Sequence, residues 1–65
     1  MKVNILRRPA VEARTGLSRS TIYQRMSEGN FPKAISLGDR AVGWVEAEIT
    51  DWLNQKIKAS RTAAD

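Results

Sequence analysis

The chain has 65 residues, a net charge of +4 and a sequence pI near 10.1. A chain of this length forms one domain and buries too little apolar surface to enclose a deep catalytic pocket. The absence of cysteine and histidine excludes a disulfide framework, a thiolate or imidazole metal site and the commonest general base. The composition therefore predicts a small binding domain that is not an enzyme and needs no cofactor or metal.

The basic residues are concentrated in the first half of the chain. Residues 1–33 carry seven Lys or Arg and two Asp or Glu, whereas residues 34–65 carry four and five. Such an asymmetry is typical of a polyanion binder, although a modest net charge also serves solubility. No apolar run approaches the roughly 18 residues of a membrane span, and Met1–Leu6 is too short for a signal peptide. We expect a cytoplasmic, nucleoid-associated protein without membrane contact.

The chain begins with signals for an extended segment and a first helix. Lys2–Leu6 is expected to form a short extended lead-in, with Val3, Ile5 and Leu6 available for the core. A first helix is expected over Pro9–Thr15, because proline is tolerated at the first helical position. Gly16 ends this helix, since glycine adopts a positive φ at almost no steric cost.

A second helix is expected over Arg19–Glu28, directly after a sharp turn. The hydroxyl of Ser18 can cap it, and Leu17 and Ile22 have the spacing of a hydrophobic staple. Gly29 occupies the position of a left-handed helix end. Together these signals predict a helix-turn-helix, with an ordinary helical hairpin as the alternative.

The second half predicts a hairpin and a third helix. After the non-helical segment 30–32, in which Phe31 is expected to fold onto the core, Lys33–Val45 reads as two short strands around a Gly-Asp-Arg turn. Glu46–Lys58 has the apolar spacing of an amphipathic helix. Its predicted buried stripe is Ile49, Trp52, Leu53 and Ile57.

The expected fold is mostly α with a small β-hairpin, a winged helix-turn-helix with three helices and a two-stranded wing. The domain is expected to span residues 1–58, and residues 59–65 are expected to form a flexible tail.

The polar residues at the start of the second helix suit the major groove of DNA. A B-form major groove admits one helix, usually by its N-terminal end. Arg19 can reach guanine edges or a phosphate, and Gln24 can read adenine. Ser20 and Thr21 can bond phosphates, as can Tyr23. The alternatives are a half-buried Tyr23 packed on the first helix and an internal hydroxyl at Thr21.

Five further cations are candidates for phosphate contacts. Arg25 lies further along the second helix, and Arg40 lies at the hairpin tip, where a wing would meet the DNA backbone. Lys33 is at the base of the hairpin, and Arg7 and Arg8 flank the start of the first helix, which crosses the backbone in the usual docking. Each of them can instead be a solvated surface charge.

Two other classes of function remain alternatives. The polar face of the second helix can serve a protein partner, as in an antirepressor-like module that acts on another regulator. An RNA binder needs exposed aromatic side chains for base stacking, whereas Trp44 and Trp52 fall on inward-facing positions. An enzyme is disfavoured, because the chain has no glycine-rich phosphate loop and no base to activate Ser18 or Ser20.

Four segments in this order resemble the AlpA family of small phage and prophage regulators. They are Gly16–Tyr23, Gly29–Lys33, Leu37–Trp44 and Glu48–Trp52 within a resemblance that spans Ile5–Ile57. The family is similar to the DNA-binding part of MerR-type regulators and to small excisionases. The resemblance implies a winged-helix core, binding to double-stranded DNA, and either control of integrase genes or prophage excision.

The resemblance also assigns roles to individual positions. It places base recognition at Arg19, Ser20, Tyr23 and Gln24 and the wing tip at Arg40. Unlike full MerR proteins, the chain ends after one short helix instead of a long dimerisation helix and an effector domain. We therefore expect no small-molecule effector, and either a monomer in solution or cooperative assembly on neighbouring DNA sites.

Overall fold

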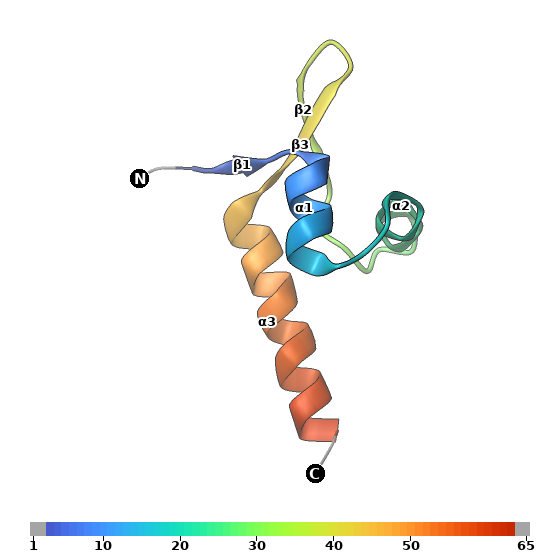
Figure 1. The fold of residues 1–65 in the computed structure, drawn as a ribbon, viewed down its shortest axis with the longest axis vertical. Coiled ribbons are helices and arrows are strands. Elements are labelled where there is room, and N and C mark those ends of the chain that lie inside the picture. Colours follow the sequence, from blue (N-terminus) through green and yellow to red (C-terminus); the bar gives the residue numbers. More distant parts are fainter. Residues whose placement is uncertain (1–2, 64–65) are drawn as a thin grey trace.

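The computed structural model describes residues 3–63, whose course is drawn in Figure 1. A short strand precedes two short helices, a β-hairpin and a long final helix. Their bounds are β1 Ile5–Leu6, α1 Arg8–Thr15, α2 Arg19–Ser27, β2 Ile35–Gly38, β3 Ala41–Val45 and α3 Glu46–Ala63. The prediction of a mostly helical domain with a small hairpin is confirmed.

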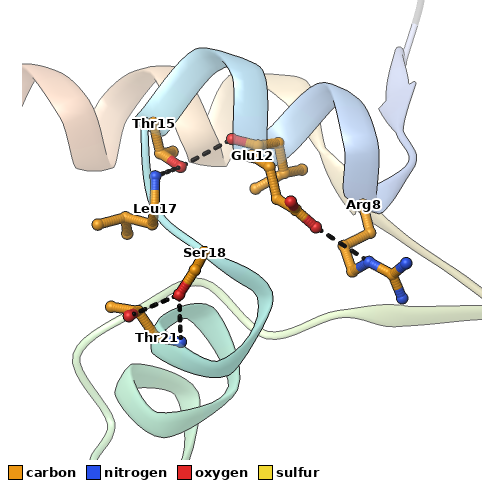
Figure 2. Close-up of polar contacts among 7 residues, drawn as sticks. Arg8, Glu12, Thr15, Leu17, Ser18 and Thr21 are labelled. Carbon is orange, nitrogen blue, oxygen red and sulfur yellow. Dashed lines mark hydrogen bonds and ion pairs between the residues drawn. The ribbon is translucent and has the colours of Figure 1, made fainter.

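Local interactions build the turn between α1 and α2. Gly16 has a φ of +72°, and its amide donates to a carbonyl one turn earlier at 2.8 Å, which ends α1. The Oγ of Ser18 accepts from the amide of Thr21 at 3.3 Å and so caps α2 (Figure 2). Between them, Thr15 Oγ1 accepts from the amide of Leu17 at 3.2 Å. The predicted helix end and the predicted cap are both confirmed.

The C-terminal end of α2 is a Schellman motif. Gly29 has a φ of +78°, and its amide donates to the carbonyl of Met26 at 3.1 Å. The amide of Asn30 donates to the carbonyl of Arg25 at 2.8 Å. The expected left-handed glycine is confirmed. The motif turns the chain out of α2 into an irregular segment, residues 28–34, which we name the link and which leads to β2.

The sheet has three antiparallel strands in the order β1-β3-β2. Leu6 of β1 lies opposite Trp44 of β3, and Ile35 of β2 lies opposite Gly43 of β3. The prediction of a two-stranded ribbon is therefore wrong in strand number. The lead-in pairs with β3, because an unpaired strand edge otherwise leaves backbone donors and acceptors without partners.

The core takes one fully or nearly fully buried side chain from each packing element. Half-buried apolar residues surround it, including Leu17 next to the Ser18 cap and Trp52 on α3. The inward position of the Trp44 ring is confirmed, whereas Trp52 lies at the margin of the core. The buried hydrophobic side chains are those of Val11 of α1, Ile22 of α2, Phe31 of the link, Trp44 of β3 and Ile49 of α3.

The last helix is longer than the sequence predicted. α3 continues to Ala63 instead of ending at Lys58, so the expected tail is helical up to that residue and its last two residues lie outside the described part. The helix projects from the remaining elements and gives extents of 46 × 31 × 20 Å (Figure 1). The predicted burial of Ile57 is wrong, because its side chain is 46% exposed where α3 has passed the core.

Candidate nucleic-acid interface

The N-terminal end of α2 has the electrostatics of an anion site. Its first turn contains no Asp or Glu. Because the amides of a first helical turn point outward and the helix dipole is positive there, this end attracts phosphates and other acceptors. The Ser18 cap fixes where the helix begins and therefore where those amides lie.

Four predicted recognition residues share the solvent face of α2. Arg19, Ser20, Tyr23 and Gln24 are all exposed, and spacings of one, three and four place them on one side of the helix. The Arg19 Cζ lies 5.8 Å from the centroid of the Tyr23 ring. Tyr23 is 38% exposed, so its hydroxyl can reach a ligand on this face. The structure thus brings together the side chains to which the family resemblance assigned base recognition.

Thr21 and Arg25 lie away from that face. The Thr21 hydroxyl is 2.9 Å from the Ser18 hydroxyl and belongs to the cap (Figure 2). Arg25 is half-buried, and its Nε is shielded from solvent without a hydrogen-bond partner among residues 3–63. Because the two residues are four apart, they share the flank of α2 next to its buried side. Their DNA contacts stay a prediction.

The hairpin presents a single arginine at its tip. Arg40 is exposed and has a φ of +59°, a conformation that side chains other than glycine rarely adopt. The tip stands away from the helices at the far end of β2 and β3 (Figure 1). Lys33 is also exposed, in the link before β2. The two cations are separated by the length of the first hairpin strand.

The two arginines at the start of α1 differ in their surroundings. Arg7 is exposed and is the residue before the helix. The Nε of Arg8 lies 3.1 Å from Oε2 of Glu12, one helical turn further on. In Figure 2 the two terminal nitrogens of Arg8 point away from that carboxylate. Glu12 therefore orients Arg8 and offsets part of its charge.

The sequence did not predict how the link is held. The Nε1 of Trp52 donates to the carbonyl of Asn30 at 2.7 Å, and the Nε1 of Trp44 donates to the carbonyl of Pro32 at 3.1 Å. The signal in the sequence was general: an indole N–H at a core margin needs an acceptor. Which acceptor it finds depends on the tertiary fold.

The described residues form neither a cluster of metal-ligating side chains nor a membrane-spanning helix. Within residues 3–63, His, Cys, Asp and Glu nowhere gather in a group of three or more that could hold a metal ion. Over the same part of the chain, every helix is too short or too polar to span a membrane.

Comparison with known proteins places the chain in a family. Residues 4–57 match the family described as Prophage CP4-57 regulatory protein (AlpA). The DNA-binding transcriptional activator AlpA of Escherichia coli strain K12 is 47% identical, over 86% of this chain and 89% of that protein. The uncharacterized protein ORF88 of Enterobacteria phage P4 is 42% identical, over 92% of this chain and 68% of that protein.

These matches confirm the resemblance to the AlpA family and bear on the prediction of a non-catalytic domain. The family is one of regulatory proteins and not of enzymes, which agrees with the prediction of a non-catalytic domain. The match runs from Asn4 to Ile57 and so contains all six secondary-structure elements at least in part. The chain belongs to the AlpA family of prophage regulatory proteins.

Proposed function

We propose that the protein binds double-stranded DNA sequence-specifically and regulates transcription from a phage or prophage promoter. The observation that carries the proposal is the exposed face of Arg19, Ser20, Tyr23 and Gln24 at the capped, acid-free start of α2. These side chains can donate hydrogen bonds to the acceptor atoms of base edges and phosphates. The DNA-binding activator that is 47% identical to the chain supports the same proposal.

The remaining cations position the protein on the duplex. The hairpin acts as the wing of a winged helix, and Arg40 at its tip contacts the phosphate backbone or a minor groove. Arg7, Arg8, Arg25 and Lys33 contact phosphates. The protein binds as a monomer or assembles cooperatively on neighbouring sites, without a small-molecule effector.

The finer role follows from where the protein binds. Occupancy of an integrase promoter makes it a regulator of that gene, whereas occupancy of an attachment site makes it an excisionase. Both roles use the same recognition surface and differ in the location of the site.

The test is a selection of sheared genomic DNA of the source organism on the purified protein, followed by sequencing. We expect enrichment of a discrete motif, whose position distinguishes promoter from attachment site. A matched control is Lys58→Ala, which removes one exposed cation of α3 outside the proposed interface. Uniform, salt-sensitive recovery of all fragments by the wild-type protein contradicts sequence-specific binding and directs the search to a protein partner.

A further inference from the structure

Three consecutive residues of the link are fixed by the core. The carbonyl of Asn30 accepts from Trp52 of α3 at 2.7 Å, and the carbonyl of Pro32 accepts from Trp44 of β3 at 3.1 Å. Phe31 between them is 6% exposed, and its ring meets the Trp52 ring edge-on with 4.8 Å between centroids. Two indole donors from different elements therefore hold both sides of one buried phenylalanine.

The link connects the two proposed DNA-contacting parts. It leaves the end of α2 through the Schellman motif and returns to β2, which carries the chain to the hairpin tip (Figure 1). Arg19 lies in α2 and Arg40 lies in the turn between β2 and β3, so both reach their DNA contacts at once only if the link has one defined course. A shift of about 1 Å of α2 relative to the hairpin is enough to break bidentate hydrogen bonds to a base.

We propose that Trp44 and Trp52 are positioning residues for DNA recognition, which fix the recognition helix α2 relative to the wing by holding the link. The inference rests on the function proposed above and extends it to α3, a helix without a proposed DNA contact of its own. We call the two indole hydrogen bonds to the link, from Trp44 and Trp52, the clamp. Loss of the clamp lowers the ratio of specific to non-specific DNA affinity more than it lowers non-specific DNA affinity. The reason is that general binding depends on cations that keep their charge in every clamp variant.

Trp52 is the better residue to change, because Trp44 is fully buried and its loss empties the core. A cleft of about 570 Å³ runs between the link and α3 and is lined by Asn30, Phe31 and Trp52 among others. Since this cleft is open at the surface, water can replace the lost donor at the Asn30 carbonyl. The fold therefore tolerates the change while the course of the link loosens.

The experiment compares Trp52→Phe, which removes the donor and keeps an aromatic ring, with Trp52 replaced by 3-benzothienylalanine, which keeps the two-ring shape without the N–H. The control is Leu53→Ala, which lowers core packing next to Trp52 and keeps both indole hydrogen bonds to the link. Affinities for the selected motif and for a scrambled duplex are measured well below each variant's Tm. Hydrogen exchange of the Gly29 and Asn30 amides is measured in the free proteins.

We expect both Trp52 variants to lose about fivefold in the specific-to-scrambled affinity ratio, the scale of one lost hydrogen bond, with scrambled binding within about twofold of wild type. Exchange at Asn30 should become faster in both variants, and Leu53→Ala should change neither quantity beyond its loss of stability. An unchanged ratio, unchanged exchange, or an equal loss in the control overturns the clamp. Hydrogen exchange is measured without DNA and so does not depend on the proposed function. If the wild-type protein shows no DNA-sequence preference, the proposed function is refuted, and the exchange at Gly29 and Asn30 still decides whether Trp52 holds the link.

Discussion

The Nη2 of Arg14 in α1 lies 2.8 Å from Oε2 of Glu46, the first residue of α3. The same glutamate accepts from Asn4 Nδ2 at 3.1 Å through its other oxygen. One carboxylate therefore joins the segment before β1, the last turn of α1 and the start of α3. Glu46 also carries a negative charge at a helix N-terminus, where the helix dipole favours it.

The first prediction concerns this junction. Arg14→Ala should lower the free energy of unfolding by about 0.5 kcal/mol, because solvent reaches both partners, whose side chains are 46% and 29% exposed. Glu46→Ala should cost about 1 kcal/mol, since it removes the bond to Asn4 and the charge at the helix start as well. Urea denaturation of both single variants and the double variant measures the coupling. A coupling energy of zero would show that the two side chains do not interact in solution.

The second prediction separates the cap of α2 from its proposed ligand. Ser18→Ala should lower the free energy of unfolding by about 1 kcal/mol through loss of the cap. Ser18→Asp should keep the stability, because aspartate caps equally well, but weaken DNA binding by placing a negative charge beside the expected phosphates. Denaturation and fluorescence anisotropy with a labelled duplex measure the two effects. If Ser18→Asp binds DNA as tightly as wild type, this end of α2 does not face the duplex.

The third prediction tests base recognition. Arg19→Ala should weaken binding to the selected motif by about 1–3 kcal/mol and relax the preference at one base pair. Binding titrations against every substitution of the motif measure both quantities, with Lys58→Ala as the charge-matched control. Equal losses on every sequence would instead make Arg19 a phosphate contact.

The fourth prediction uses the unusual backbone of Arg40. Arg40→Gly should leave the free energy of unfolding unchanged or raise it by about 0.5 kcal/mol, because glycine accepts a positive φ without strain. If four to six phosphates are neutralised in the complex, log affinity falls against log salt with a slope of roughly −4 to −5. Arg40→Gly should reduce the magnitude of that slope by about 1. Arg40→Asn is the control for the added backbone freedom of glycine, because asparagine also tolerates the left-handed region and removes the same charge. An unchanged slope would place the wing tip away from the backbone.

The fifth prediction concerns the close approach at the sheet. A Cβ at position 43 would overlap Cγ2 of Ile5 and lie 3.1 Å from Cδ1 of Leu37 and 3.2 Å from the Leu6 carbonyl. Gly43→Ala should therefore lower the free energy of unfolding by about 1–3 kcal/mol. Thermal denaturation measures it, and adding Ile5→Ala should recover part of the loss by removing the obstructing methyl. Full additivity of the two changes would mean that Ile5 is not the obstacle.

Much of the candidate site follows from the sequence because its signals are local. Each signal acts within about one helical turn. The signals are the positive φ of Gly16, the Ser18 hydroxyl that caps the Thr21 amide, and the run of donors without a carboxylate at the start of α2. The exposed face of Arg19, Ser20, Tyr23 and Gln24 follows from helical spacing once the Ser18 cap fixes where α2 begins. The half-burial of Arg25 did not follow, because it depends on which elements pack beside α2.

By itself the sequence determined, to within two residues, where the helices and the hairpin begin and turn, as well as that α2 presents donors at its start and that the chain resembles one regulatory family. Only the tertiary structure decided that the lead-in becomes a third strand, that α3 passes beyond the core and exposes Ile57, and that Trp44 and Trp52 hold the link. The physical reason is the range of the interactions. Caps and turns are satisfied by residues a few positions away, whereas strand pairing, burial and indole hydrogen bonds need partners that are distant in the sequence and meet only when the chain has folded.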